Sequence, residues 1–208
     1  MDRLCRLILV RHGETLGQSG IRYYGATDIP LSSLGRVQAR EARGRIPGET
    51  FEAVWASSLA RSWQAAQIIA PGHLVRLEAD FREIDFGRWE GLTREEIERL
   101  DPELHADWQA RKPDFEFPEG ETRSVFRRRI EAGLLRLRAS GVRSALVVVH
   151  KGVVRTLLEL LSQYTLAPEM PELGGVIHMY RDQGGVWLTG RRGSDDSCGE
   201  TAVGIPFS

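Results

Sequence analysis

The chain of 208 residues lacks the features that mark several large classes of protein. It has only two cysteines, Cys5 and Cys198, which lie far apart and form no Cys-x-x-Cys pattern. This usage argues against a disulfide framework or a thiolate metal site, and it fits a reducing compartment. The formal net charge is -1, so no basic excess indicates nucleic acid or an anionic membrane as a partner. Any anion that the protein binds must therefore be held locally, in a pocket.

Long hydrophobic runs are also missing. Only four consecutive apolar residues, 7–10, precede Arg11, which is too few for the core of a signal peptide. No other run approaches the length of a membrane span. We therefore expect a cytoplasmic protein that has no membrane partner, and nothing in the sequence predicts its oligomeric state.

Apolar segments alternate with amphipathic ones, as in an ordinary globular protein with 41% hydrophobic and 27% charged residues. We expect strands over residues 4–10, 51–55, 74–77, 144–149, 176–180 and 186–189. We expect helices over residues 34–46, 59–70, from 93 onward, 101–111, 126–137 and 152–164. This order predicts an α/β fold with three layers, α/β/α, and a mostly parallel central sheet.

The domain organisation is simple. A chain of this length can bury one sizeable core, so residues 1–190 are predicted to form one catalytic domain. Residues 191–208 are polar and glycine-rich and are predicted to form a poorly ordered tail. Thr93 and Glu96 have the spacing of a capping box, and residues 112–121 are typical of a loop or lid.

Two predicted strands end in a histidine. Residues 7–10 continue into Arg11-His12-Gly13, and residues 144–149 continue into His150-Lys151-Gly152. Open α/β sheets bind ligands at the carboxyl ends of their strands. Two histidines at such ends, with arginines nearby, predict a pocket for phosphate.

Five segments extend this pattern along the chain. They are Arg11-His12-Gly13-Glu14-Thr15, residues 24–31 with Gly35 and Gln38-Ala39, residues 57–61 with 64–66, residues 82–91, and residues 150–155. In this order they resemble the histidine phosphatase superfamily, the phosphoglycerate-mutase-like group, over nearly all of the chain before the tail. The resemblance implies the phosphoglycerate-mutase-like fold and metal-independent chemistry on a phosphomonoester.

The resemblance implies that His12 is the nucleophile, and the residue chemistry agrees. A neutral imidazole attacks phosphorus well, and a covalent phosphohistidine divides hydrolysis into two easier steps. Arg11 and Arg61 would hold the phosphoryl oxygens with planar forks, and their charge should lower the pKa of His12. His150 would donate a further hydrogen bond, and the helix after it would offer backbone amides to the phosphate.

A carboxyl group must protonate the leaving alcohol and later deprotonate the attacking water. Glu83 is the candidate, and its pKa would have to be raised by burial or by a bound phosphate. Glu14, Asp85 and Glu90 are rivals, and only the family resemblance favours Glu83.

Several residues are candidates for contacts with the substrate. Gln18 and Lys151 stand where many relatives have asparagine and glycine, and both could reach an anionic substrate. A further candidate is Gly25, and Arg22, Tyr23, Lys112, Phe115 and Phe117 are candidates to line the leaving-group side. The run Arg127-Arg128-Arg129 is interpreted as a solvated helix face.

The main prediction is a phosphomonoesterase of the histidine acid phosphatase type that acts on a small phosphorylated metabolite without metal or cofactor. A mutase is an alternative, although the insertion with paired arginines that such mutases carry is missing and residues 117–122 resemble the phosphatase branch. A non-catalytic phosphate-binding regulatory module is another. A metal hydrolase is a weaker alternative because His12 and Glu14 lack the partner motifs, and no Gly-x-x-x-x-Gly-Lys-Ser/Thr indicates nucleotide binding.

Overall fold

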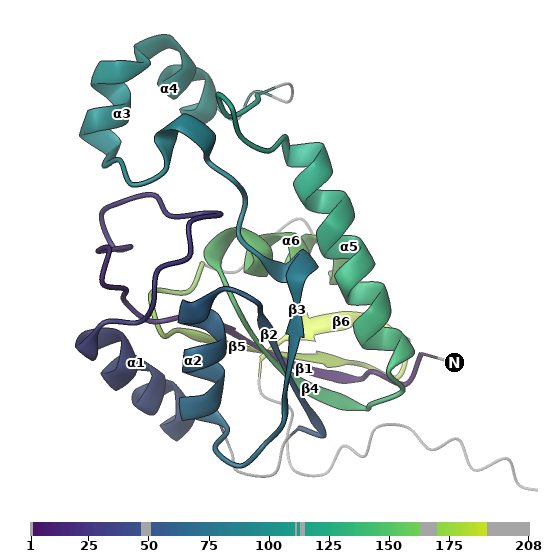
Figure 1. The fold of residues 1–208 in the computed structure, drawn as a ribbon. Helices are drawn as coiled ribbons and strands as arrows, with labels where there is room; N and C mark the ends of the chain where they lie inside the picture. The colour runs from purple at the N-terminus through teal and green to yellow at the C-terminus, as the bar shows by residue number, and fades with distance from the viewer. Residues whose placement is uncertain (1, 47–50, 111, 113–114, 163–169, 191–208) are drawn as a thin grey trace, which may run out of the picture.

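A central sheet of six strands organises the computed structural model, which describes residues 2–46, 51–110, 112, 115–162 and 170–190 (Figure 1). In spatial order the strands are β3 (Val75–Glu78), β2 (Ala53–Ser57), β4 (Ser144–Val149), β1 (Arg6–Arg11), β5 (Val176–Arg181) and β6 (Trp187–Thr189). The first four are parallel to one another, and β5 and β6 pair antiparallel. The predicted α/β class with a mostly parallel sheet is confirmed.

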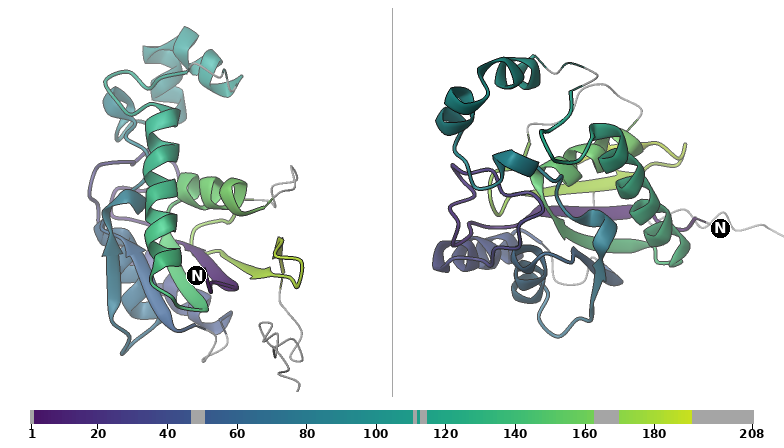
Figure 2. Two further views of the ribbon diagram at one scale, coloured as in Figure 1. Left: turned by 90° about the vertical axis from the view of Figure 1, so that its right-hand side faces the viewer. Right: turned by 45° about the horizontal axis from the view of Figure 1, so that its top comes forward.

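Helices cover both faces of this sheet (Figure 2). They are α1 (Ser33–Gly44) and α2 (Ala60–Ile69) on one face, and α5 (Arg123–Ala139) and α6 (Lys151–Leu161) on the other. Two short 3-10 helices, η1 (Ala79–Phe81) and η2 (Gly87–Trp89), follow β3. Helices α3 (Arg94–Leu100) and α4 (Pro102–Gln109) lie apart from these layers (Figure 1).

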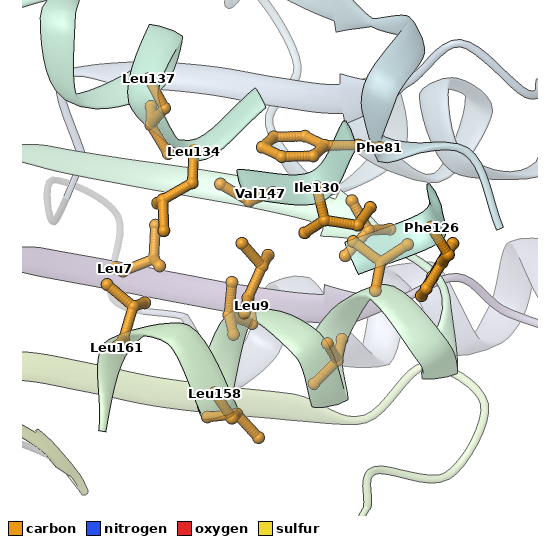
Figure 3. Packing of buried hydrophobic residues seen from close by; sticks show 14 of the residues in the cluster. Leu7, Leu9, Phe81, Phe126, Ile130, Leu134, Leu137, Val147, Leu158 and Leu161 are labelled. Carbon is orange, nitrogen blue, oxygen red and sulfur yellow. The ribbon is translucent and has the colours of Figure 1, made fainter. Parts of the chain in front are cut away.

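The core is divided between the two faces of the sheet because side chains of a strand alternate in direction. Leu7 and Leu9 of β1 pack with α5 and α6, as Figure 3 shows. Ile8 and Val10 belong to the cluster that contains residues of α1 and α2. A strand buried on both faces explains the unbroken apolar run before Arg11.

Most predicted elements are present, with ends displaced by a few residues. Strand β4 has the predicted bounds, and the capping box is formed: Thr93 Oγ1 accepts from the amide of Glu96, whose carboxylate accepts from the amide of Thr93 at 2.7 Å. The part of residues 112–121 that the structure describes is a loop with one isolated bridge. The predicted helix end at Tyr164 and the tail at residues 191–208 lie outside the described residues.

The structure bears on the expected absence of a membrane span and on the expected state of the cysteines. No helix in the described part of the chain is long and apolar enough to span a bilayer. Cys5 is disulfide-bonded, so the expectation of reduced cysteines does not hold for this residue.

The start of α1 lies directly against the loop that follows β1. A Cβ added at Gly35 would lie 1.9 Å from the carbonyl oxygen of Glu14, a rigid backbone atom. We therefore expect Gly35→Ala to lower the free energy of unfolding by about 1–3 kcal/mol, the usual cost of overpacking. Urea unfolding measures this, and Gly44→Ala in the same helix is the control because a Cβ there meets nothing within 4 Å. Equal effects of the two substitutions would contradict the close contact.

Candidate active site

The two histidines lie side by side because their strands are neighbours. Arg11 is in register with Val149 across β1 and β4, so His12 and His150 follow paired residues. The amide of His12 donates to the carbonyl of Val149 at 2.9 Å, and the two imidazole centroids are 5.0 Å apart. Both side chains are buried. The structure thus brings together the two histidines that the sequence placed only on separate strand ends.

His12 presents one free ring nitrogen. Its Nδ1 lies 2.7 Å from the carbonyl oxygen of Gly13. Because a carbonyl can only accept, Nδ1 carries the proton and Nε2 keeps its lone pair. Burial, and next the charge of Arg61, hold the pKa of His12 well below its usual range. The ring is therefore neutral and has a lone pair on Nε2, as the predicted role of nucleophile requires.

His150 is oriented by Arg61, whose Nε lies 3.3 Å from His150 Nδ1 as a donor. This contact requires an unprotonated Nδ1, so Nε2 is the donor nitrogen of His150. Nε2 lies 3.3 Å from the hydroxyl oxygen of Ser62. Burial lowers the pKa of His150 well below its ordinary value, and the charge of Arg61 adds to this. His150 is therefore a neutral hydrogen-bond donor.

Arg61 is fully buried, and backbone oxygens occupy both ends of its guanidinium group. Its Nη1 donates to the carbonyl of Thr27 at 2.8 Å, and Nη2 donates to the carbonyl of Gly25 at 2.7 Å. This differs from the predicted open fork. Arg61 ties the loop before α1 to His150, while its charge stays close to both histidines.

The guanidinium of Arg11 has a nitrogen, Nε, without a hydrogen-bond partner among the described residues. Its Nη1 donates to the carbonyl of Pro171 at 3.2 Å, but Nε is buried. An unpaired buried donor costs about 1–3 kcal/mol. Arg11 itself lines the cavity that contains His12, as the predicted phosphate contact requires.

The side chain of Glu83 is buried, and its carboxyl group contacts the first turn of α6. Its Oε2 accepts from the amide of Gly152 at 2.9 Å, and Oε1 accepts from the amide of Ile84 at 3.0 Å. Burial raises the pKa of Glu83, against the lowering effects of these hydrogen bonds and of Arg61. The prediction that the amides of α6 face the phosphate is therefore wrong for Gly152, whose amide holds Glu83 instead.

The three other candidate carboxylates accept hydrogen bonds from backbone amides of loops. Glu90 accepts from the amides of Gly25 and Ala26, at 3.0 and 2.9 Å. Asp85 accepts from the amide of Gly87 at 2.8 Å, and Glu14 from that of Thr15 at 2.7 Å. Of these four candidate carboxylates, all of which the structure describes, Glu83 alone lines the cavity beside His12.

That cavity has a volume of about 400 Å³. The predicted residues that line it are Arg11, His12, Arg22, Tyr23, Glu83 and Lys151. Arg94 and Glu95 at the start of α3 also line it, and no motif pointed to them. Within the described residues, no group of three or more His, Cys, Asp or Glu side chains is placed to hold a metal ion.

Two predicted substrate contacts have other roles. Gln18 has a φ of 64°, and its carbonyl accepts from the amide of Arg22, so it forms the turn of the loop. Gly25 allows close packing, because a Cβ there would lie 1.7 Å from the carbonyl oxygen of Ile84. Neither is among the residues that line the cavity. Both act on the site through the shape of the loop.

The five candidates for the leaving-group side have different positions, and two of them, Arg22 and Tyr23, line the cavity beside His12. Phe117 lines a second cavity, which also contains Tyr23 and Glu83. Phe115 is buried in the core, and the Nζ of Lys112 pairs with Asp107 at 2.6 Å. Of the five candidates, Tyr23 and Phe117 therefore line the second cavity.

The interpretation of the arginine run as a solvated face is wrong for Arg129. Its Nη2 donates to the carbonyl of Glu83 at 2.9 Å, and its Nη1 donates to the carbonyl of Arg82 at 2.6 Å. The same guanidinium forms two hydrogen bonds with Glu121, at 2.7 and 2.8 Å. Arg129 therefore fastens the segment that carries Glu83 to α5, a contact that no local pattern could indicate.

Gly152 is required for the position of Glu83. A Cβ at residue 152 would lie 2.4 Å from Oε1 of Glu83. The obstructed atom ends a flexible side chain, so Gly152→Ala should displace the carboxyl while leaving stability within about 1 kcal/mol. We expect kcat on an alkyl phosphate to fall about 10- to 100-fold, since proton transfer typically contributes 10²–10⁴-fold.

The measurement is steady-state phosphate release, together with thermal unfolding. Gly44→Ala is the control, because Gly44 lies outside the site and a Cβ there meets nothing within 4 Å. An unchanged kcat in Gly152→Ala would show that the contact with Glu83 does not matter for turnover.

Comparisons with known proteins identify relatives of this chain. A family model of the histidine phosphatase superfamily (branch 1) matches residues 7–174. An adenosylcobalamin/alpha-ribazole phosphatase of Salmonella typhimurium is 32% identical over 163 residues, covering 75% of this chain and 79% of that protein. Phosphoglycerate mutase-like protein 4 of Arabidopsis thaliana is 33% identical over 160 residues, covering 74% and 69%.

Solved structures share the fold. The alpha-ribazole phosphatase of Shigella flexneri matches with a TM-score of 0.75 and 25% identity, covering 88% of this chain and 93% of that one. The predicted phosphoglycerate-mutase-like fold and the predicted family are both confirmed. The chain belongs to the histidine phosphatase superfamily.

Proposed function

We propose that this protein hydrolyses the phosphomonoester bond of a small phosphorylated metabolite through a phosphohistidine on His12. The observation that carries the proposal is the placement of His12 and Glu83 in one cavity, with the pKa of the imidazole lowered and the pKa of the carboxyl raised. His12 is neutral with Nε2 unprotonated, and the raised pKa of Glu83 favours the protonated carboxyl. A neutral nucleophile, beside a carboxyl that keeps its proton to a higher pH than usual, is what transfer to histidine requires.

In the first step, Nε2 of His12 forms a bond to phosphorus while the bond from phosphorus to the ester oxygen breaks. The carboxyl proton of Glu83 passes to that oxygen, so the leaving group departs as a neutral alcohol. Glu83 is then a carboxylate, held by the amides of Gly152 and Ile84.

In the second step, a water oxygen bonds to phosphorus and the bond from phosphorus to Nε2 breaks. The Glu83 carboxylate accepts the proton that the water loses, which restores the carboxyl. Inorganic phosphate leaves, and His12 returns to its neutral form, in which protonated Nδ1 donates to the carbonyl oxygen of Gly13.

The phosphoryl oxygens gain charge and need donors in both steps. Arg11 lines the same cavity as His12, and its guanidinium group would donate to one of these oxygens. His150 would supply its Nε2 proton by exchanging its contact with Ser62. Arg61 acts through its charge and by orienting His150, and direct contact with phosphate would require exchange of a backbone partner.

The relatives favour hydrolysis. Besides the alpha-ribazole phosphatases, the relatives include a phosphoserine phosphatase of Hydrogenobacter thermophilus, 30% identical over 152 residues. Their substrates are small phosphomonoesters by name, which supports the same class for this chain. The mutase alternative remains open to test, since it would move the phosphoryl group to an alcohol instead of to water.

The test is phosphate release from a panel of esters in excess chelator. The panel contains 4-nitrophenyl phosphate, phosphoserine, 3-phosphoglycerate, a sugar phosphate and a ribonucleoside monophosphate. Turnover that persists in chelator supports the proposal, and turnover that the chelator removes contradicts the metal-independent mechanism. Movement of phosphate within 3-phosphoglycerate without release would indicate a mutase, and no reaction by the folded protein would indicate a binding module.

A further inference from the structure

A second cavity of about 500 Å³ adjoins the phosphate cavity. The two share four lining residues: Tyr23, Glu83, Phe86 and Lys151. Since Glu83 is the proposed proton donor to the leaving oxygen, the second cavity begins where the alcohol part of the ester must lie. Its walls therefore indicate which leaving group fits.

One wall is aromatic. The rings of Tyr23 and Trp108 are 5.3 Å apart, those of Tyr23 and Phe86 are 5.5 Å apart, and those of Phe86 and Phe117 are 5.0 Å apart, all edge to face. These rings come from the loop after β1, from α4 and from the segments on either side of them, so each holds the next in place. A wall of interlocked rings is preorganised for a flat apolar group.

The opposite wall is cationic and comes from α6. Lys151 is the first residue of this helix and Arg155 lies four positions on, so both side chains project from the same face. Like charges at this spacing repel, and a cation in the first turn opposes the helix dipole. Neither side chain makes an ion pair within the part of the chain that the structure describes. This arrangement costs stability unless an anion binds there.

The other cations of the cavity are occupied. Arg127 pairs with Glu159, with 3.3 Å between Nη1 and the carboxylate oxygen. Arg123 lies over the ring of Phe115, with 5.5 Å to its centroid. The charge that remains for a ligand therefore belongs to Lys151 and Arg155. The pKa of Lys151 is lowered by burial and by the charges of Arg11 and Arg155.

We propose that the second cavity is a leaving-group subsite for alcohols that carry a flat apolar group and a second anionic group, a carboxylate or a phosphate. The apolar group packs against the aromatic wall, and the anion binds between Lys151 and Arg155. The subsite rests on the proposed function, because it places the alcohol beside Glu83. Cationic alcohols are disfavoured, since four basic side chains line the cavity against two carboxylates.

The test compares phenyl phosphate with 4-carboxyphenyl phosphate, which differ by one carboxylate. We expect wild-type kcat/KM to be about tenfold higher or more for the carboxylated ester, mostly through KM, as for a charge-assisted hydrogen bond. Arg155→Gln should remove most of this ratio, Arg155→Lys should restore part of it, and Lys151→Met should reduce it. Because each variant is measured on both esters, intrinsic reactivity cancels.

Arg128→Gln is the matched control, because Arg128 is an exposed arginine of α5 that lines neither cavity. It should leave kcat/KM on both esters unchanged. The aromatic wall is tested by Trp108→Leu, which should reduce kcat/KM for phenyl phosphate more than for glycerol phosphate.

The outcomes separate the two proposals. If the wild-type protein cleaves the esters but the carboxylate brings no gain, or Arg155→Gln leaves the ratio intact, the subsite is wrong and the hydrolase stands. A failure of the folded wild-type protein to release phosphate from any ester overturns the hydrolase and the subsite with it.

Discussion

His12→Ala should reduce phosphate release by at least about four orders of magnitude, as expected when the nucleophile of a covalent mechanism is removed. The other groups of the site can still bind the ester, so its affinity should change much less. Steady-state kinetics on an alkyl phosphate measures the loss, and equilibrium binding of inorganic phosphate checks the retained site. His73→Ala is the control because His73 is exposed and lines neither cavity.

Detection of the covalent phosphohistidine is a second measurement that tests the role of His12. Rapid quenching of the wild-type protein in base should leave one phosphoryl group on the peptide that contains His12, and acid should release it. The label should be absent from His12→Ala. Turnover by His12→Ala at more than a small fraction of the wild-type rate, or a label on another residue, would overturn the nucleophile assignment.

Glu83→Gln should reduce kcat on alkyl phosphates by about 10²–10⁴-fold, because these leaving groups need a proton. With 4-nitrophenyl phosphate, whose leaving group needs no proton, phosphorylation of His12 should be largely retained. Hydrolysis of the phosphohistidine still lacks its base and should become rate-limiting. A burst of about one nitrophenolate per protein, followed by slow turnover, is the expected trace.

The pH dependence of kcat/KM should reflect the titration of His12 and Glu83. Since the pKa of His12 is lowered, the nucleophile stays neutral as the pH falls below the usual histidine range. Since the pKa of Glu83 is raised, its proton is kept to a higher pH than an ordinary carboxyl allows and is lost as the pH rises further. Wild-type kcat/KM should therefore fall on the alkaline side, and Glu83→Gln should lack that limb because an amide does not titrate.

Titration of the ester itself affects both proteins equally, so only the difference between their profiles reports on Glu83. Glu90→Gln is not a suitable control because Glu90 holds the amides of Gly25 and Ala26. Glu131→Gln avoids this difficulty, because Glu131 is an exposed residue of α5 that lines neither cavity. An alkaline limb that persists in Glu83→Gln would assign the proton to another group.

The local part of the fold follows from sequence patterns. The strand ending before His150 has the predicted bounds, and the capping box at Thr93 forms as its spacing indicates. Such features depend on neighbouring residues, whose geometry is set by backbone periodicity and a few hydrogen bonds. His12 and His150 were identified in the same way, because each directly follows an apolar strand.

The tertiary structure decided how distant residues share the site. Glu83 follows β3, which is separated from β1 by two strands, and no local pattern distinguished it from Glu14, Asp85 or Glu90. Two hydrogen bonds hold it in position. The amide of Gly152 donates to its carboxylate, and the guanidinium of Arg129 donates to its backbone carbonyl. These contacts span 69 and 46 residues of the chain.

The sequence by itself therefore determined the layered α/β architecture, the family and the identity of the two histidines. Only the tertiary structure decided that Arg61 orients His150, that Arg129 fastens the acid segment, and that Gly25 serves close packing. The physical reason is that burial and partner choice set the proton state and role of a polar side chain. Both depend on which segments the fold brings together.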